Sequence, residues 1–69
     1  MEIPTLEINS RGIWVYMLQA ALNYRNFGVP LTGVFNMDTF NAVKAFRREF
    51  YLTGDTVVDL EFWKKLLNY

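Results

Sequence analysis

Hydrophobic side chains recur at steps of three and four residues in three segments of the chain. That spacing lines them up on one face of a helix, where they can be buried together. The segments are residues 12–26, 37–50 and 60–68, so the pattern predicts three helices and an all-α fold. The predicted buried faces are Val15, Leu18, Ala21 and Leu22 in the first helix, Phe40, Val43, Phe46 and Phe50 in the second, and Leu60, Trp63, Leu66 and Leu67 in the third.

The second and third predicted helices begin with the same local pattern. Asn36 precedes one and Asp59 the other, and the side-chain oxygen of either residue can accept hydrogen bonds from the first free amides of a helix. An acid follows two positions later, Asp38 or Glu61, where the helix dipole favours negative charge. Repeated capping and true internal duplication both account for this similarity. In either case the pattern defines where these two helices start.

Turn-forming residues separate the predicted helices around residues 28–33 and 53–56. A fainter copy of the capping pattern, Ile8-Asn9 followed by Ile13, predicts the start of the first helix. We expect the first two helices to pack together and the third to close one end. With 69 residues in all, the chain is predicted to form a single domain over residues 1–69.

The composition removes several classes of function. The chain has no cysteine and no histidine, which excludes disulfides, thiolate or imidazole metal sites and histidine-assisted catalysis, so we expect no metal and no cofactor. Seven basic and seven acidic residues cancel, which argues against a nucleic-acid partner. No apolar run is long enough for membrane insertion. Residues 1–5 do not resemble a secretory signal, so export would need a signal outside this sequence.

Three blocks of residues then match a known pattern in order and spacing. The opening block contains Pro4, Thr5, Leu6, Ser10, Arg11, Gly12, Val15, Leu18, Gln19 and Leu22; the central block contains Gly33, Val34, Phe35, Thr39, Ala42, Val43 and Phe46; the closing block contains Leu52, Asp55, Val57, Val58, Trp63 and Leu66. Together they resemble the peptidoglycan-binding domain family, a three-helix module of bacterial and phage wall hydrolases. The match covers nearly the whole chain, from about residue 4 to residue 67.

The chain departs from the family mainly at glycines. Family members usually have glycine at the positions occupied here by Asn9, Asn26, Asn36, Tyr51, Thr56 and Asp59. Asparagine and aspartate tolerate a left-handed backbone, so four of these changes are compatible with the fold. Tyr51 is different, because an aromatic residue makes that conformation costly. We therefore expect either a different end to the second helix or backbone strain there.

The resemblance implies a non-catalytic module that holds a linked protein, such as a hydrolase, on peptidoglycan through a shallow groove that contacts glycan or stem peptide. Side chains suited to such a groove are Gln19, Tyr24, Asn26, Phe27, Thr32, Asn36, Asp38 and Arg47. Several have a structural alternative: Asn36 as a helix cap, Asp38 as a partner of the helix dipole, Phe27 in the core, and Gln19 bonded to loop backbone. Arg25 and Arg47 suit a carboxylate clamp or simple solvation.

The first predicted helix also suggests a second function. Family members usually carry polar residues where this chain has Ile13, Trp14, Tyr16 and Met17. Either this helix is tucked more deeply between its neighbours, or part of the set is exposed and forms a protein interface with a linked enzyme or a second copy. The alternative function is thus a protein-interaction domain that has lost glycan binding. No carboxylate pair suggests glycoside hydrolysis. We expect the protein in the bacterial cell envelope or outside the cell, exported as part of a larger protein.

Overall fold

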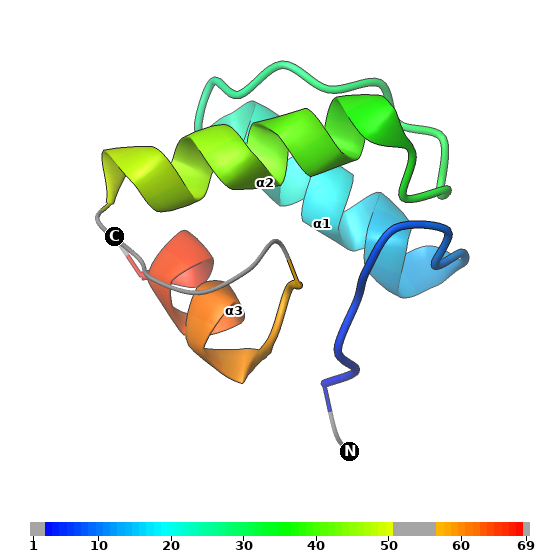
Figure 1. Ribbon diagram of the computed structural model, residues 1–69, viewed down its shortest axis with the longest axis horizontal. Helices are drawn as coiled ribbons and strands as arrows, with labels where there is room; N and C mark the ends of the chain where they lie inside the picture. Colours follow the sequence, from blue (N-terminus) through cyan, green and yellow to red (C-terminus); the bar gives the residue numbers. More distant parts are fainter. Residues whose placement is uncertain (1–2, 51–56, 69) are drawn as a thin grey trace.

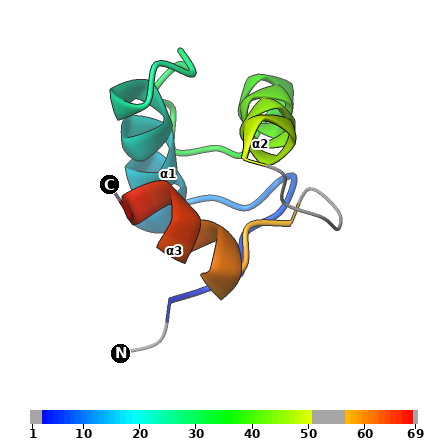
Figure 2. The same cartoon turned by 90° about the vertical axis from the view of Figure 1, so that its left-hand side faces the viewer.

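The computed structural model describes residues 3–50 and 57–68, and it confirms the all-α, three-helix fold. The helices are α1 (Ile13–Tyr24), α2 (Met37–Glu49) and α3 (Leu60–Leu67). In Figure 1, α2 crosses in front of α1, and α3 lies below α2. Figure 2 shows the same three helices turned by 90°. Because α1 packs against both α2 and α3, it is the central element, whereas the sequence predicts only its packing with α2.

The predicted caps of α2 and α3 are present. The Asn36 side chain accepts a hydrogen bond from the Thr39 amide at 3.1 Å, and the Asp59 side chain accepts one from the Phe62 amide at 3.0 Å. The start of α1 is different, because its N-cap residue is Gly12, which makes no side-chain cap bond. The capping role predicted from Ile8-Asn9 is therefore wrong.

Two of the asparagines that replace family glycines take the left-handed conformation. Asn9 has φ of 77° and Asn26 has φ of 69°. The N-cap residues of α2 and α3 are instead extended, with φ of −96° and −100°. The prediction extends the first helix to residue 26, but α1 ends at Tyr24 because the left-handed Asn26 cannot continue it. Tyr51 and the predicted loop at residues 53–56 lie outside the described residues.

The core is made from all three helices and from the segments before them. Its fully or almost fully buried members are Leu6, Val15, Leu18, Leu22, Val29, Phe35, Ala42, Val43, Phe46, Val58, Phe62, Trp63 and Leu66. Phe62 is a core residue that the spacing does not predict, and its ring lies 5.0 Å from that of Phe46. The predicted burial of Leu60 and Leu67 is wrong, since each is about half exposed. The short α3 turns Phe62, Trp63 and Leu66 inward instead.

The residues before α1 tie the starts of the other helices together. Leu6 and Val58 exchange two backbone hydrogen bonds, of 2.9 and 2.7 Å, just before α3. The Phe35 amide donates to the Ser10 carbonyl at 2.8 Å, just before α2. These short antiparallel contacts join the chain segments that lead into α2 and α3, so the positions of the two helices depend on the same N-terminal segment.

Candidate functional site

The loop from residue 25 to residue 36, between α1 and α2, is fastened to α1 by two amide side chains. The first is Asn23, whose Oδ1 accepts from the Val29 amide at 2.9 Å while its Nδ2 donates to the Val29 carbonyl at 2.6 Å. One side chain therefore satisfies both backbone polar groups of Val29, whose own side chain is buried in the core. This double contact fixes the first half of the loop against the end of α1.

The second fastening is Gln19, whose side chain is fully buried. Its Oε1 accepts from the amides of Thr32 and Gly33, both at 2.9 Å. Its Nε2 lies within donating distance of the Val34 carbonyl at 3.0 Å and of the Thr39 and Thr32 hydroxyls at 2.9 and 3.2 Å. Because Thr39 belongs to α2, this amide joins α1, the loop and α2. Gln19 therefore supports the loop from inside and does not reach the surface.

An open groove of about 490 Å³ lies between this loop and α2. The residues that line it are Phe27, Gly28 and Pro30 from the loop and Asp38, Asn41, Ala42 and Ala45 from α2. Small-molecule sites commonly have volumes of ~300–1,000 Å³. The groove is therefore large enough for a sugar ring or a short peptide.

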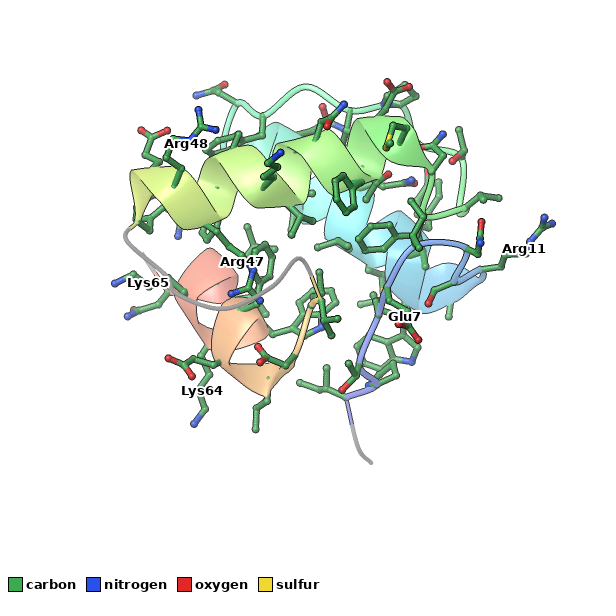
Figure 3. The ribbon with its side chains drawn as sticks, viewed as in Figure 1. Glu7, Arg11, Arg47, Arg48, Lys64 and Lys65 are labelled. Atoms are coloured by element: carbon green, nitrogen blue, oxygen red, sulfur yellow. The ribbon has the colours of Figure 1, made fainter. Side chains whose placement is uncertain are left out.

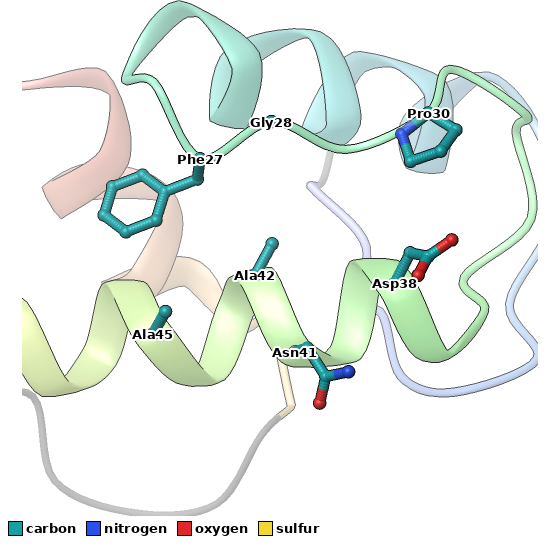
Figure 4. Close-up of a pocket in the computed structure, with 7 residues that line it drawn as sticks. All are labelled: Phe27, Gly28, Pro30, Asp38, Asn41, Ala42 and Ala45. Carbon is teal, nitrogen blue, oxygen red and sulfur yellow. The ribbon is translucent and has the colours of Figure 1, made fainter.

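The α2 side of the groove has an apolar floor and a polar rim. Asn41, Ala42 and Ala45 follow Asp38 at steps of three, four and seven, which places all four residues on one face of the helix. Figure 4 shows the methyl groups of Ala42 and Ala45 pointing toward the loop and the Asp38 carboxylate lying on the side of Pro30. Asn41 also belongs to the lining, but its amide extends from the helix on the side away from the loop. The small floor residues leave the space that larger side chains would fill.

Two of the predicted ligand-binding residues, Phe27 and Asp38, line this groove. Phe27 is half-buried, and its ring packs edge-on against Phe46 at 5.5 Å, so it serves both the core and the groove. Asp38 is exposed in the first turn of α2, where the helix dipole also favours it. For these two residues the structural and functional interpretations are compatible.

The other predicted polar residues near the loop do not line the groove. Tyr24 is 70% exposed at the end of α1, and Asn26 forms the exposed left-handed turn that follows. The Thr32 hydroxyl accepts from the Val34 amide at 3.2 Å and lies in the hydrogen-bond network around Gln19. Asn36 is the N-cap of α2. Thr32 and Asn36 thus belong to the framework that shapes the loop.

Arg47 lies away from the groove, on the side of α2 that faces α3, as Figure 3 shows. It donates a hydrogen bond to the Val57 carbonyl, and its guanidinium lies 5.2 Å from the centre of the Phe62 ring. The Asp59 carboxylate is 4.0 Å away. The Arg47 side chain is only 11% exposed. It is therefore neither a solvated surface arginine nor placed to clamp a ligand in the groove. It links α2 to the start of α3.

The predicted interface residues of α1 separate into two groups. Ile13, Tyr16 and Met17 are 66%, 43% and 46% exposed, and their three- and four-residue spacing places them on one outward face. Trp14 is half-buried and packs edge-on against Trp63, with ring centres 6.0 Å apart. The exposed face therefore contains three of the four predicted residues, while Trp14 stabilises the contact with α3.

Five groove residues are absent from the predicted site: Gly28, Pro30, Asn41, Ala42 and Ala45. The sequence marks the first two as loop residues and both alanines as places where a neighbour can approach closely. The spacing from Asp38 to Asn41 and Ala45 also assigns them to one helix face. What the spacing could not reveal is that the loop passes over this face.

Residues 3–50 and 57–68 contain neither a membrane-spanning helix nor a cluster of metal ligands. No helix in this part of the chain has the length and apolar character needed to span a membrane. The same residues contain no group of three or more acidic, histidine or cysteine side chains arranged to hold a metal ion.

The comparisons with known proteins bear on this groove-bearing fold. Neither the curated proteins nor the solved structures provide a match. One family model, described as "Putative peptidoglycan binding domain", matches residues 12–66. This range runs from the N-cap of α1 to the last buried residue of α3 and so includes every residue that lines the groove. The chain therefore belongs to the peptidoglycan binding domain family.

Proposed function

We propose that this domain attaches a linked protein to bacterial peptidoglycan through the groove between the 25–36 loop and α2. Membership of the family associates the chain with the cell wall and makes it a binding module. The observation that carries the proposal is the groove itself, which has a floor of two alanines, a polar rim and a loop wall held in place by hydrogen bonds to the buried Gln19 side chain. The linked protein that would benefit most from such attachment is a wall hydrolase. The domain and the hydrolase would be exported together as one larger protein and would act in the cell envelope or outside the cell.

The groove supports binding without catalysis. Glycoside hydrolysis requires two carboxyl groups on either side of one bond, about 5–10 Å apart. Among the described acidic residues only Asp38 lines the groove. Asp59 is the N-cap of α3, beside Arg47. A lone exposed carboxylate can accept hydrogen bonds from a ligand, but it lacks the partner that the two-carboxylate mechanism requires.

The test is retention of the purified domain on isolated peptidoglycan sacculi. In Ala45→Gln, a long neutral side chain would occupy the floor of the groove on an exposed helix position, so we expect retention to fall without loss of folding. Lys44→Gln introduces the same side chain on the neighbouring exposed position outside the groove, and it should bind like the native chain. Equal retention of the two variants, or no retention of the native chain, contradicts the proposal.

A specific observation also favours the alternative function of protein interaction. The twelve residues of α1 include no charged side chain, and Ile13, Tyr16 and Met17 are exposed along one face. Exposed apolar faces of this kind often mark contact surfaces. If the domain serves this purpose, a linked enzyme or a second copy covers α1. In either case sacculi would not retain the native chain. If the partner is a second copy, sedimentation would also reveal self-association that Ile13→Ser with Met17→Ser abolishes.

A further inference from the structure

Peptidoglycan offers two chemically different ligands, a glycan strand whose sugars present hydroxyl and acetamido groups and stem peptides that carry carboxylates. If the groove is the binding site, as proposed above, its side chains distinguish between them. We propose that the groove takes a neutral N-acetylated sugar of the glycan strand and rejects the carboxylate-bearing stem peptide. This inference rests on the proposed function and makes it more specific.

The charge of the groove is the first reason. Of its seven lining residues Asp38 is the only charged one, and it is an exposed carboxylate. Proteins usually hold a ligand carboxylate with arginine or lysine, often through two parallel hydrogen bonds. Here a carboxylate ligand would meet a like charge at the rim and no cation within the lining. Electrostatics therefore disfavour the acidic parts of a stem peptide.

The two arginines considered for a carboxylate clamp are engaged elsewhere, which is the second reason. Arg47 bonds the Val57 carbonyl and lies over Phe62, on the side of α2 that faces α3. Arg25 donates to the Asn68 carbonyl at 2.6 Å and lies 5.9 Å from the centre of the Phe50 ring. Neither arginine lines the groove. Bringing either one to the groove would break its contacts with the third helix or with the residue that follows it.

The remaining lining suits a sugar, which is the third reason. The Asp38 carboxylate can accept from sugar hydroxyls, and the Asn41 amide can both donate to and accept from hydroxyl or acetamido groups. Between these polar groups and Phe27 lies the floor of Ala42 and Ala45, against which the apolar face of a pyranose ring or an acetyl methyl can pack. An N-acetylated sugar can therefore place its hydroxyl groups at the polar rim of the groove and its apolar face on the alanine floor.

The experiment titrates the ¹⁵N-labelled domain with two soluble probes and follows its amide resonances. The probes are the β-1,4-linked tetramer of N-acetylglucosamine and a stem tetrapeptide with free carboxylates. We expect the tetramer to shift the amides of Gly28, Asn41 and Ala45, and the tetrapeptide to leave them unchanged. Because the ligand is neutral, its affinity should change little between low and high salt.

Variants at the rim separate hydrogen bonding from charge. Asp38→Ala should weaken tetramer binding by about tenfold or more, since a hydrogen bond to a charged acceptor is lost. Asp38→Asn keeps an acceptor and should weaken it by less. Lys44→Gln is the control and should bind the tetramer as the native chain does.

Each contrary result has a defined meaning. If the tetrapeptide shifts the amide resonances of these residues and the tetramer does not, the choice of sugar is overturned. The proposed function still stands in that case if sacculi retain the native domain and Ala45→Gln reduces the retention. Tetrapeptide binding by the native domain that Asp38→Asn abolishes would likewise overturn it, by identifying the ammonium group of the peptide as the ligand. Tetrapeptide shifts that appear only in Asp38→Asn would instead support the exclusion of carboxylates by the charge of Asp38. Failure of the sacculi to retain the native chain would contradict the proposed function itself.

Discussion

The Gln19→Leu substitution tests how much the buried amide contributes to the fold. Leucine fills nearly the same volume, so the main change is the loss of hydrogen bonds. The Val34 carbonyl keeps a contact with the Thr32 hydroxyl at 3.2 Å, and the Thr39 hydroxyl keeps one with Asn36 at 3.2 Å. The groups left without their acceptor are the amides of Thr32 and Gly33.

The magnitude follows from these two amides. A buried donor that loses its partner costs about 1–3 kcal/mol, so the pair costs roughly 2–6 kcal/mol before any relaxation of the loop. Burial of the added apolar surface of leucine offsets about 1–2 kcal/mol. Because Thr32 is exposed, water can reach its amide, which favours the lower half of the range. We expect a net loss of about 2 kcal/mol in the free energy of unfolding, a large fraction for so short a chain.

Urea unfolding followed by far-ultraviolet circular dichroism measures this loss. Lys44→Ala, at an exposed position of α2, is the control and should stay within about 0.5 kcal/mol of the native chain. A double-mutant cycle that combines Gln19→Leu with Thr39→Val should give a coupling free energy of about 0.5 kcal/mol or more. The reason is that Gln19 Nε2 donates a hydrogen bond to the Thr39 hydroxyl at 2.9 Å. A native-like stability for Gln19→Leu, or strict additivity with Thr39→Val, would refute the role assigned to Gln19.

Three further predictions concern stability and use the same unfolding measurement. Asn26→Ala should cost about 1 kcal/mol because its φ is 69°, whereas Asn26→Gly should be neutral or slightly stabilising; equal effects would exclude a backbone origin. Trp14→Ala should cost about 2–4 kcal/mol through the lost contact with Trp63, whereas Ile13→Ser should cost less than 1 kcal/mol; the reverse order would mean that α1 packs differently. Asn36→Ala should cost about 1 kcal/mol as a lost cap, and Asn36→Ser should recover most of it.

The helices and two of their starts could be predicted because they depend on local chemistry. The three- and four-residue spacing of Val15, Leu18 and Leu22 defines a buried face before any partner is known. Asn36 and Asp59 bond amides only three residues away, so a short stretch of sequence contains the whole interaction. The burial of Phe62 is not predicted by the spacing, and the predicted burial of Leu60 is wrong, because both depend on which side of α3 meets α1 and α2.

The candidate site was only partly predictable, for the same reason. Residue type predicts Phe27 and Asp38 as ligand-binding residues, and both line the groove. Residue type also predicts Arg47, yet its side chain points toward α3. Residue type identifies what a side chain can bind, but the element that faces it decides what it does bind.

The sequence by itself determined the helical class, the caps of α2 and α3, the absence of cysteine and histidine chemistry, and the resemblance to a peptidoglycan-binding module. The tertiary structure alone decided that the 25–36 loop passes over Ala42 and Ala45 and leaves a groove there. It also decided that Gln19, thirteen residues before Thr32, is buried beneath that loop. The physical reason is range: capping and periodicity act within a few residues, whereas a groove exists only where two distant segments come together and their side chains are too small to fill the space between them.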